Sequence, residues 1–414
     1  MIGRNSRTAV VTGIGMVTAL GQGVEAHRLA LGEGQSGVRP ISRFATDHLG
    51  TRFAASVDFT ASSDATPPER SEMLAALALE EAVAQSGVVG ADQLVLGFPP
   101  IQFGWPERFS FARSVSEHAA GYDDLIRAAL KPESRALREN FRPGASAERL
   151  AERFEVRDDA LTVSSACSSG STAIIMGVDA IRNGHADRVI VAGADASLSP
   201  EMLARFGKLS ALSTRNDEPE TASRPFDETR DGFVPGEGAG AVVLEAREFA
   251  EERGADILGV VSGIAEVSDG YHRLRHQPDA ERIVAVMAAA IADAGLSPSD
   301  IDCVNAHGTS TPENDWMEYT GCAKVFGAAL EGLPVTALKS MIGHTLSAAG
   351  AIEFAASIMM LEDQVIYPTI NVATIDPKIA LDIVPNTARK SRLRHILSNS
   401  FGFGGQNACI IVSR

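Results

Sequence analysis

Cys167 is the residue of this sequence with the clearest potential for covalent chemistry. It lies in "SSACSSGS" (164–171), between the apolar run "ALTV" (160–163) and the segment "STAIIMGVDAIRNG" (171–184). We interpret "ALTVSSA" as a short buried strand, followed by a tight turn at Gly170 and a helix. Unpaired N–H groups at a helix start favour a thiolate. The pattern predicts a nucleophile with a lowered pKa, against the common alternative of a packing cysteine.

Two histidines lie in similar small-residue turns later in the chain. His307 belongs to "NAHGTSTP" (305–312) and His344 to "LKSMIGHTLSAAG" (338–350). Alone, each is more often a core or surface histidine. Both follow predicted strand ends, where open α/β sheets bind their ligands. A cysteine and two histidines at matching strand ends therefore predict one shared site.

Repeated segments indicate how the chain brings these turns together. Three pairs match in order: 80–100 with 288–308, 162–174 with 335–352, and 236–246 with 401–413. In the first pair, Gly87 and Asp92 match Gly295 and Asp300 in spacing. The repeat predicts two α/β halves, 1–250 and 251–414, in a layered α-β-α-β-α body. Chance similarity of two generic units is the alternative. The polar segment 248–257 would join the halves, and 101–150 would be a mostly helical insertion in the first.

The composition narrows the classes of partner. The 414 residues carry a net charge of −16, which disfavours nucleic acid and anionic membranes. No apolar run reaches the length of a membrane span, so we predict no membrane insertion. The four cysteines, including Cys303, Cys322 and Cys409, show no zinc-type spacing. We therefore expect reduced thiols, no metal and a cytoplasmic protein.

Six ordered motifs resemble those of a known family. They are "SSACSSG", "SRPFD" (223–227), "DGFVPGEGAG" (231–240), "NAHGTSTPENDWMEYTG" (305–321), "KSMIGHTLSAAG" (339–350) and "NSFGFGGQNA" (399–408). The chain resembles the β-ketoacyl-acyl-carrier-protein synthases, most closely the elongating, KAS II-type condensing enzymes of the thiolase superfamily. The resemblance extends from residue 9 to the C-terminus and is weak only across about 60–150. It implies the thiolase-like fold, a duplicated five-layer αβαβα body.

The resemblance also implies roles in a decarboxylative Claisen condensation. Cys167 would carry the acyl chain as a thioester. His307 and His344 would hold the malonyl thioester carbonyl and assist loss of carbon dioxide. The N–H groups of Cys167 and Phe401 would form the oxyanion hole for the acyl carbonyl, and Phe401 would be the gate between the acyl and malonyl sites. Initiating synthases use Cys-His-Asn, so His344 indicates an elongating enzyme, and Cys409 is interpreted as a core residue.

Further residues follow from the same resemblance. Lys339 would orient the site electrostatically, with Glu353 as a further charged member. Thr309 and Thr311 would bind the phosphopantetheine arm of an acyl carrier protein, the substrate carrier; no permanently bound cofactor is implied. Gly402 would allow close approach of substrate, and Asn399 would support the site. A homodimer is expected.

Two regions depart from the family pattern. "GFPPIQFGWPERF" (97–109) replaces a glycine-rich loop near the acyl pocket, and its Phe98 and Pro100 would line that pocket. Phe98 and Phe103 would narrow the pocket if they pointed inward; we favour an outward orientation, against the 101–150 insertion. Near 61–73, only Arg70 remains of the usual basic residues for the carrier protein. A substitute basic patch would come from Lys208 or from three arginines of the insertion, Arg135, Arg138 and Arg142.

Two other functions remain open. A chain-length-factor-like subunit would have this fold and pair with a true synthase without being catalytic, but such subunits lack the cysteine. A ketosynthase for polyketide, aryl-polyene or very-long-chain acyl groups would keep the chemistry and change the substrate. The altered 97–109 loop mildly favours that second possibility.

Overall fold

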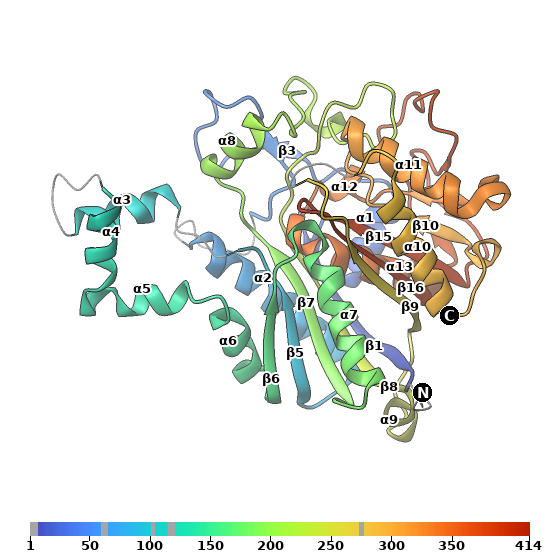
Figure 1. The fold of residues 1–414 in the computed structure, drawn as a ribbon, viewed down its shortest axis with the longest axis horizontal. Helices are drawn as coiled ribbons and strands as arrows, with labels where there is room; N and C mark the ends of the chain where they lie inside the picture. The colour runs from blue at the N-terminus through green and yellow to red at the C-terminus, as the bar shows by residue number, and fades with distance from the viewer. Residues whose placement is uncertain (1–6, 59–64, 101–103, 115–120, 273–276) are drawn as a thin grey trace.

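A mixed sheet of 12 strands forms the centre of the molecule (Figure 1). The computed structural model describes residues 7–58, 65–100, 104–114, 121–272 and 277–414. The strand order is β13-β11-β10-β15-β16-β9-β1-β8-β7-β5-β6, with β2 beside β1. The strands of this sheet are β1 (Ala9–Thr18), β2 (Gly21–Gln22), β5 (Ala91–Gly97), β6 (Val156–Val163), β7 (Arg188–Asp195), β8 (Gly238–Ala246), β9 (Gly259–Ser268), β10 (Cys303–Asn305), β11 (Pro334–Thr336), β13 (Asp382–Ile383), β15 (His395–Phe401) and β16 (Gln406–Ser413).

The remaining elements are helices and two short strand pairs. The pairs are β3 (Arg39–Pro40) with β4 (Phe53–Ala54), and β12 (Val365–Ile366) with β14 (Arg389–Lys390). The helices are α1 (Val24–Gly32), α2 (Pro67–Ser86), α3 (Trp105–Arg113), α4 (Tyr122–Ala129), α5 (Arg135–Asn140), α6 (Ala145–Arg153), α7 (Ser169–Arg182), α8 (Pro200–Lys208), α9 (Arg247–Glu252), α10 (Glu281–Asp293), α11 (Pro312–Phe326), α12 (Lys339–Ile342) and α13 (Ala349–Asp363).

The layers confirm the predicted five-layer α/β fold. Strands β1, β8, β7, β5 and β6 form one sheet half, and β9, β16, β15, β10 and β11 form the other. The halves join through a short antiparallel contact between β1 and β9. Helices α7 and α13 pack against each other and contact both halves, so they form the middle layer. Helix α2 covers the outer face of the first half, and α10 with α11 covers the second.

The two halves repeat the same strand pairing. In each half the first three strands are antiparallel neighbours and the next two pairs are parallel. Gly87 after α2 and Gly295 after α10 both take a left-handed φ, of 66° and 68°. This repeat supports the predicted division near residue 250, which stays a prediction.

One match within the repeat was wrong. The counterpart of Asp92 is Asp302, since each carboxylate accepts N–H groups at the start of a neighbouring strand. Asp92 accepts from Asp187 and Arg188, and Asp302 accepts from Arg394 and His395. Asp300 instead caps the 3₁₀ turn 298–300, which lengthens the second connection by two residues.

Glycines let the two middle helices approach closely. A Cβ at Gly170 of α7 would lie 2.6 Å from the Ala351 nitrogen, and one at Gly350 of α13 would lie 2.7 Å from the Ser171 nitrogen. Each glycine lies three residues after a residue of the preceding 3₁₀ turn, Cys167 in the first half and Ser347 in the second. The crossing therefore brings the two equivalent turns together.

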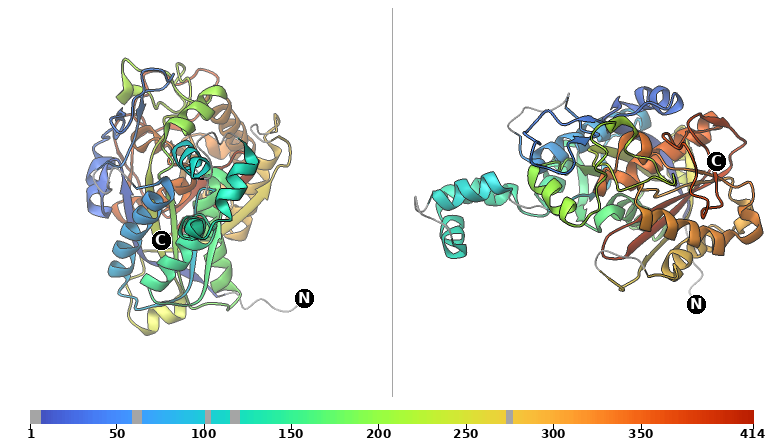
Figure 2. Two further views of the ribbon diagram at one scale, coloured as in Figure 1. Left: turned by 90° about the vertical axis from the view of Figure 1, so that its left-hand side faces the viewer. Right: turned by 90° about the horizontal axis from the view of Figure 1, so that it is seen from above.

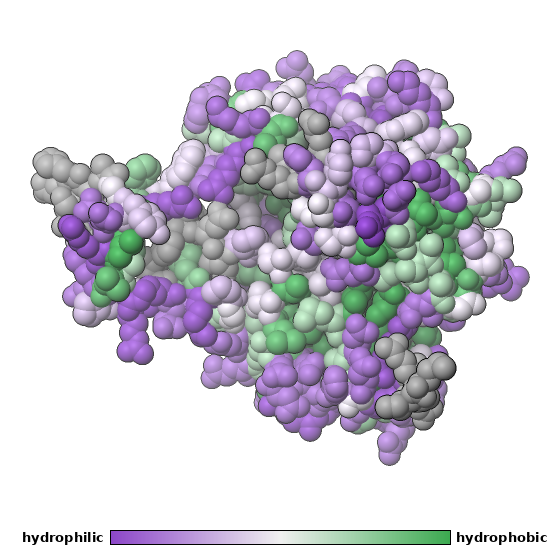
Figure 3. All heavy atoms as spheres, in the orientation of Figure 1, coloured by the Kyte–Doolittle hydropathy of each residue, from purple (hydrophilic) through white to green (hydrophobic). Residues whose placement is uncertain are grey.

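Strand β6 forms one edge of the sheet, and its residues are mostly half-buried or exposed. The prediction of a buried strand before Cys167 was therefore wrong, because β6 has a neighbour on one side only. The predicted helical insertion is present beside this edge, where α3 to α5 form an arm that projects from the body (Figures 1 and 2). Large apolar side chains on the arm are exposed: Trp105, Phe109, Tyr122, Ile126 and Leu130. Figure 3 shows hydrophobic side chains on this arm.

Candidate active site

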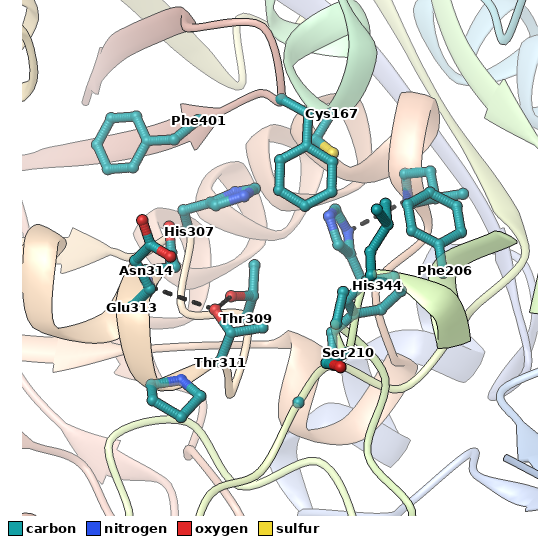
Figure 4. Close-up of a pocket in the computed structure, with 17 residues that line it drawn as sticks. Cys167, Phe206, Ser210, His307, Thr309, Thr311, Glu313, Asn314, His344 and Phe401 are labelled. Carbon is teal, nitrogen blue, oxygen red and sulfur yellow. Dashed lines mark hydrogen bonds between the residues drawn. The ribbon is translucent and has the colours of Figure 1, made fainter. Parts of the chain in front are cut away.

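A cavity of about 360 Å³ contains the three residues predicted to do chemistry. Cys167, His307 and His344 all line it, and both imidazole rings point toward the sulfur (Figure 4). The two ring centroids lie 5.3 Å apart in an edge-to-face arrangement. The structure therefore brings together residues that are far apart in the chain.

Cys167 lies in a 3₁₀ turn that leads directly into α7. The preceding Ala166 has a φ of 52°, a left-handed conformation that is unusual for a residue with a Cβ. Gly402 lies against this turn, because a Cβ there would be 2.9 Å from the Ser165 carbonyl oxygen. Gly402 is thus needed first for backbone packing beside Cys167, and substrate binding by Gly402 stays a prediction.

The acidity of Cys167 differs from the sequence prediction. The residue is only 7% exposed, and burial raises the pKa of the thiol to about 11. The N–H of Phe403 and the Lys339 ammonium lower that pKa, whereas the Asp195 carboxylate raises it further. Desolvation outweighs the favourable groups. The prediction of a lowered thiol pKa was therefore wrong, because it considered the helix start and not the burial of Cys167.

Two phenylalanines of the segment 401–403 lie near Cys167, and the predicted role of Phe401 in the oxyanion hole stays a prediction. The backbone N–H of Phe403 lowers the pKa of the Cys167 thiol, and both residues line the cavity. Phe401 is the last residue of β15, paired with Asn407 of β16. Its buried ring packs edge-on against His307 with centroids 5.7 Å apart. Phe401 therefore packs against an imidazole, whereas the Phe403 ring stacks on Phe206, and the gate role predicted for Phe401 stays a prediction.

A buried carboxylate fixes the loop of His307. Glu318 of α11 accepts the N–H groups of His307 at 2.9 Å and Gly308 at 2.8 Å. The Asn399 amide donates to the same carboxylate at 3.0 Å. Asn399 is thus connected to the His307 loop through Glu318, and its supporting role stays a prediction. Burial raises the pKa of Glu318, and these hydrogen bonds oppose that change.

Lys339 and Glu353 form an ion pair behind His307. The Lys339 ammonium donates to Glu353 and lies 3.3 Å from His307 Nδ1. Both charged side chains are 1% exposed. Burial raises the pKa of Glu353 to about 7, while the adjacent ammonium lowers it. This arrangement makes Nδ1 of His307 the acceptor and leaves its Nε2–H for the cavity.

His344 is held as a neutral imidazole. Its Nδ1 accepts the N–H of Leu346 at 3.3 Å, so the ring proton is on Nε2 (Figure 4). Its backbone N–H donates to Val234 at 2.7 Å. Burial, assisted by the positive charge of Lys339, holds the pKa of His344 well below its usual range.

The cavity mouth carries the predicted threonines and an aromatic wall. The hydroxyls of Thr309 and Thr311 lie 2.9 Å apart on the lining (Figure 4). Opposite them, Phe206 at the end of α8 stacks on Phe403 and meets Phe233 edge-on. The threonines were predicted from the sequence, whereas the wall was not.

Several predicted residues lie elsewhere. Phe98 is fully buried in the core between α2 and the sheet, so the favoured outward orientation was wrong. Pro100 is exposed, and neither residue lines this cavity. Phe103 lies outside the described residues. Arg70 is buried and donates to the Val57 carbonyl, so it is not an exposed basic residue for a carrier protein.

The sequence analysis did not identify Phe403 and Glu318 as site residues. Both lie in quoted motifs, "FGFGG" and "NDWMEYTG". The choice between the two phenylalanines depends on the turn geometry, which residue types do not specify. A carboxylate two helical turns into α11 gave the only signal for Glu318, and that signal is weak.

Across the described ranges, no cluster of His, Cys, Asp or Glu side chains is arranged to hold a metal ion. In the same part of the chain, no helix has the length and apolarity needed to cross a bilayer. All four cysteines are buried and outside any disulfide.

Comparison with known proteins identifies the family. Models described as the N-terminal and C-terminal domains of β-ketoacyl synthase match residues 108–250 and 258–373. A putative polyketide β-ketoacyl synthase 1 from Streptomyces cyaneus is 37% identical, over 99% of this chain and 98% of that protein. The 3-oxoacyl-[acyl-carrier-protein] synthase 2 of Coxiella burnetii is 35% identical, over 99% of both chains.

Solved structures agree with this assignment. A β-ketoacyl synthase from Burkholderia phymatum has a TM-score of 0.85 and 34% identity, over 99% of both chains. A type II polyketide ketosynthase, determined in complex with its acyl carrier protein, has a TM-score of 0.86 and 30% identity, over 99% of this chain and 100% of that one. This chain belongs to the β-ketoacyl synthase family.

Proposed function

We propose that this protein catalyses a decarboxylative Claisen condensation between an acyl group on Cys167 and malonyl-acyl carrier protein. The product is a 3-oxoacyl-acyl carrier protein that is two carbons longer. The observation that carries the proposal is the convergence of Cys167, His307 and His344 in one cavity. A thiol nucleophile beside two imidazole donors suits acyl transfer followed by carbanion formation.

The first half-reaction loads Cys167. Its sulfur attacks the acyl thioester, and the carrier thiol leaves with the thiol proton. The tetrahedral intermediate would place its negative oxygen beside the N–H groups of Cys167 and Phe403, which both lower the pKa of the thiol. Because the resting thiol is protonated, substrate binding must be followed by proton transfer within the cavity.

The second half-reaction generates the nucleophilic carbon. The Nε2–H groups of His307 and His344 donate to the malonyl thioester carbonyl oxygen. Carbon dioxide leaves, and its bonding electrons form the enolate that these donors stabilise. The enolate carbon attacks the acyl thioester, and the Cys167 thiolate departs. Lys339 contributes by fixing the His307 tautomer from 3.3 Å.

We further propose that an acyl carrier protein delivers both substrates through its phosphopantetheine arm. The hydroxyls of Thr309 and Thr311 would bind that arm at the cavity mouth. Lys208 is exposed on α8, next to the lining residues Leu209 and Ser210, and would contact the acidic carrier. Arg135 and Arg138 belong to α5 of the projecting arm. Arg142 follows α5 and is paired with Glu139 and Glu148. We propose that the condensation takes place in the cytoplasm.

A polyketide ketosynthase is the second candidate function. The relative from Streptomyces cyaneus is 37% identical to this chain and the polyketide ketosynthase structure 30%, against 35% for the 3-oxoacyl-[acyl-carrier-protein] synthase 2 of Coxiella burnetii. The condensation is unchanged, and the acyl group differs. The complete set of Cys167, His307, His344 and Lys339 is evidence against a non-catalytic chain-length factor.

Reconstitution with defined carrier proteins tests the proposal. Purified protein is mixed with malonyl-carrier protein labelled at the malonyl carboxyl group and with a carrier protein that holds an acyl group. The acyl group is varied from fatty acyl to polyketide-type chains. We expect release of labelled carbon dioxide and a 3-oxoacyl product, both absent in Cys167→Ala. Release of label without any 3-oxoacyl product from every acyl group offered would contradict condensation.

A further inference from the structure

Asp195 is a buried carboxylate next to the active site that the proposed chemistry does not use. It is the last residue of β7, and it is 1% exposed. One oxygen accepts the N–H of Ser197 at 2.9 Å, and the other accepts the N–H of Ser347 at 3.2 Å. Burial raises the pKa of Asp195, and the hydrogen bonds from Ser197 and Ser347 oppose that change and favour the carboxylate.

The Ser347 contact joins the two halves of the chain. Ser347 occupies in the second half the place that Cys167 has in the first, within the turn before the middle helix. Leu346, just before it, has a φ of 47°, matching the 52° of Ala166. A left-handed conformation at a leucine persists only when its surroundings hold it. The hydrogen bond from Ser347 to Asp195, in the other half of the chain, stabilises this conformation.

The same short segment controls His344. The N–H of Leu346 donates to His344 Nδ1, and the next N–H, of Ser347, donates to Asp195. A shift of this backbone would move the donor that fixes the ring tautomer. The position of the Asp195 carboxylate is thus transmitted to His344 through two adjacent peptide groups.

We propose that Asp195 is a positioning residue that orients His344 through the backbone of Leu346 and Ser347. The inference rests on the proposed function, in which the Nε2–H of His344 donates to the malonyl thioester. Asp195 does not touch that substrate in this account. Its effect is therefore expected in decarboxylation and not in loading of Cys167.

The Asp195 charge has a second, opposite effect on Cys167. Lys339 and the N–H groups of Phe403 and Cys167 lower the pKa of the thiol, and Asp195 raises it. The imidazoles of His307 and His344 also face this sulfur across the cavity (Figure 4). Removing the Asp195 charge should therefore make Cys167 more reactive while it weakens decarboxylation. Loss of general stability would not produce that combination.

The test compares Asp195→Asn with a matched control. Asparagine has the same shape and one acceptor oxygen, so one of the two N–H groups loses its partner. We expect kcat for malonyl-carrier protein decarboxylation to fall about tenfold, the effect of one lost buried hydrogen bond. Acyl transfer to Cys167 should be retained, and iodoacetamide should label Cys167 faster at about pH 8, below the thiol pKa. The control is Asp92→Asn, whose carboxylate also accepts two backbone N–H groups, and which is in addition ion-paired with Arg157, but which lies away from the cavity.

Nitrogen NMR of ¹⁵N-histidine-labelled protein provides a readout independent of activity. The His344 signal, assigned with His344→Ala, should show the Nε2–H tautomer in the unaltered protein and a tautomer mixture in Asp195→Asn. An unchanged His344 signal would overturn the proposal. Equal losses in both half-reactions, or the same loss in Asp92→Asn, would also overturn it. Absence of decarboxylation by the unaltered protein would contradict the proposed function, and the NMR comparison would still decide the role of Asp195.

Discussion

At the scale of single residues, the four cysteines differ in the groups that surround each sulfur. Burial raises the pKa of all four thiols. Only Cys167 lines the cavity, and its N–H donors and nearby Lys339 offset part of the cost of burial. Cys303, Cys322 and Cys409 are in the hydrophobic core of the second half or beside it. Reactivity therefore depends on access and on the groups that favour the thiolate.

The first prediction concerns alkylation of Cys167. Iodoacetamide should label this cysteine before the other three, and peptide mass spectrometry measures the rate of labelling at each cysteine. With a thiol pKa of about 11, the thiolate fraction rises about tenfold per pH unit below that value. The labelling rate should therefore climb steadily from about pH 7 to about pH 9. A plateau below about pH 8 would show that the thiol is much more acidic, and faster labelling elsewhere would reject Cys167 as the reactive cysteine.

The second prediction separates the half-reactions at His307. In the proposed mechanism, acyl transfer uses the sulfur and the N–H groups of Cys167 and Phe403, whereas decarboxylation uses the imidazole. His307→Ala should keep loading of Cys167 and lose decarboxylation by a factor on the order of 10²–10³. Quench-flow measurement of each half-reaction checks this. Phe401→Leu, which removes only the ring packed against His307, should give a smaller loss of the same kind.

The site residues that could be predicted from the sequence were reactive side chains in turns made otherwise of small residues. Cys167, His307 and His344 stood out in small-residue turns, and the structure places them together. Phe403 was not identified because its place beside Cys167 depends on the turn after β15, which residue types do not specify. The pKa of Cys167 was mispredicted because the extent of burial depends on packing by segments distant in the sequence.

At the scale of elements, the site depends on how α7 and α13 cross. Gly170 and Gly350 occupy equivalent positions at that crossing, and each lacks room for a Cβ. The 3₁₀ turns that precede these helices hold Cys167 and Ser347, so the crossing distance sets the separation of the two turns. The internal repeat was visible in the sequence. The register of the repeat was not visible, because the 3₁₀ turn 298–300 adds two residues. The equivalent of Asp92 is therefore Asp302 and not Asp300.

The third prediction tests this crossing. Gly350→Ala places a Cβ about 2.7 Å from the Ser171 nitrogen, so the helices must separate. The free energy of unfolding should fall by about 1–3 kcal/mol, and condensation should fall with it. Urea denaturation measures the first effect. Gly207→Ala on α8 is the control, because a methyl group added at Gly207 would meet nothing within 4 Å and helix propensity slightly favours alanine. Equal stability of the two variants would disprove the close contact.

At the scale of the whole molecule, strand β6 and the arm of α3 to α5 are exposed on the same side of the body (Figures 1 and 2). An open sheet edge and exposed apolar side chains both favour association with another chain. The five-layer fold was predicted from the repeat, because duplication leaves few ways to bury the faces of two sheets. The projection of the arm from the body was not predicted, because the sequence of its helices does not show which part of the chain they pack against.

The fourth prediction is a homodimer that uses this side. Light scattering should give twice the chain mass of 43.6 kDa at micromolar concentration. Ile126→Glu with Leu130→Glu places charge on exposed apolar positions of the arm and should shift the protein toward monomer. Leu29→Glu changes a similarly exposed leucine on α1 and should leave the mass unchanged. A monomer of the unaltered protein, or a dimer unaffected by the arm substitutions, would contradict this interface.

The central claim is that Cys167 carries the acyl group that the malonyl carbanion attacks. A single-turnover experiment with mass spectrometry of the Cys167 peptide tests it most directly. Acyl-carrier protein alone should add one acyl group to that peptide and to no other. Malonyl-carrier protein, added next, should remove the acyl group as the 3-oxoacyl product forms at the same rate. Product formation while the Cys167 peptide stays unmodified, or an acyl group that remains on Cys167 while product accumulates, would contradict the account.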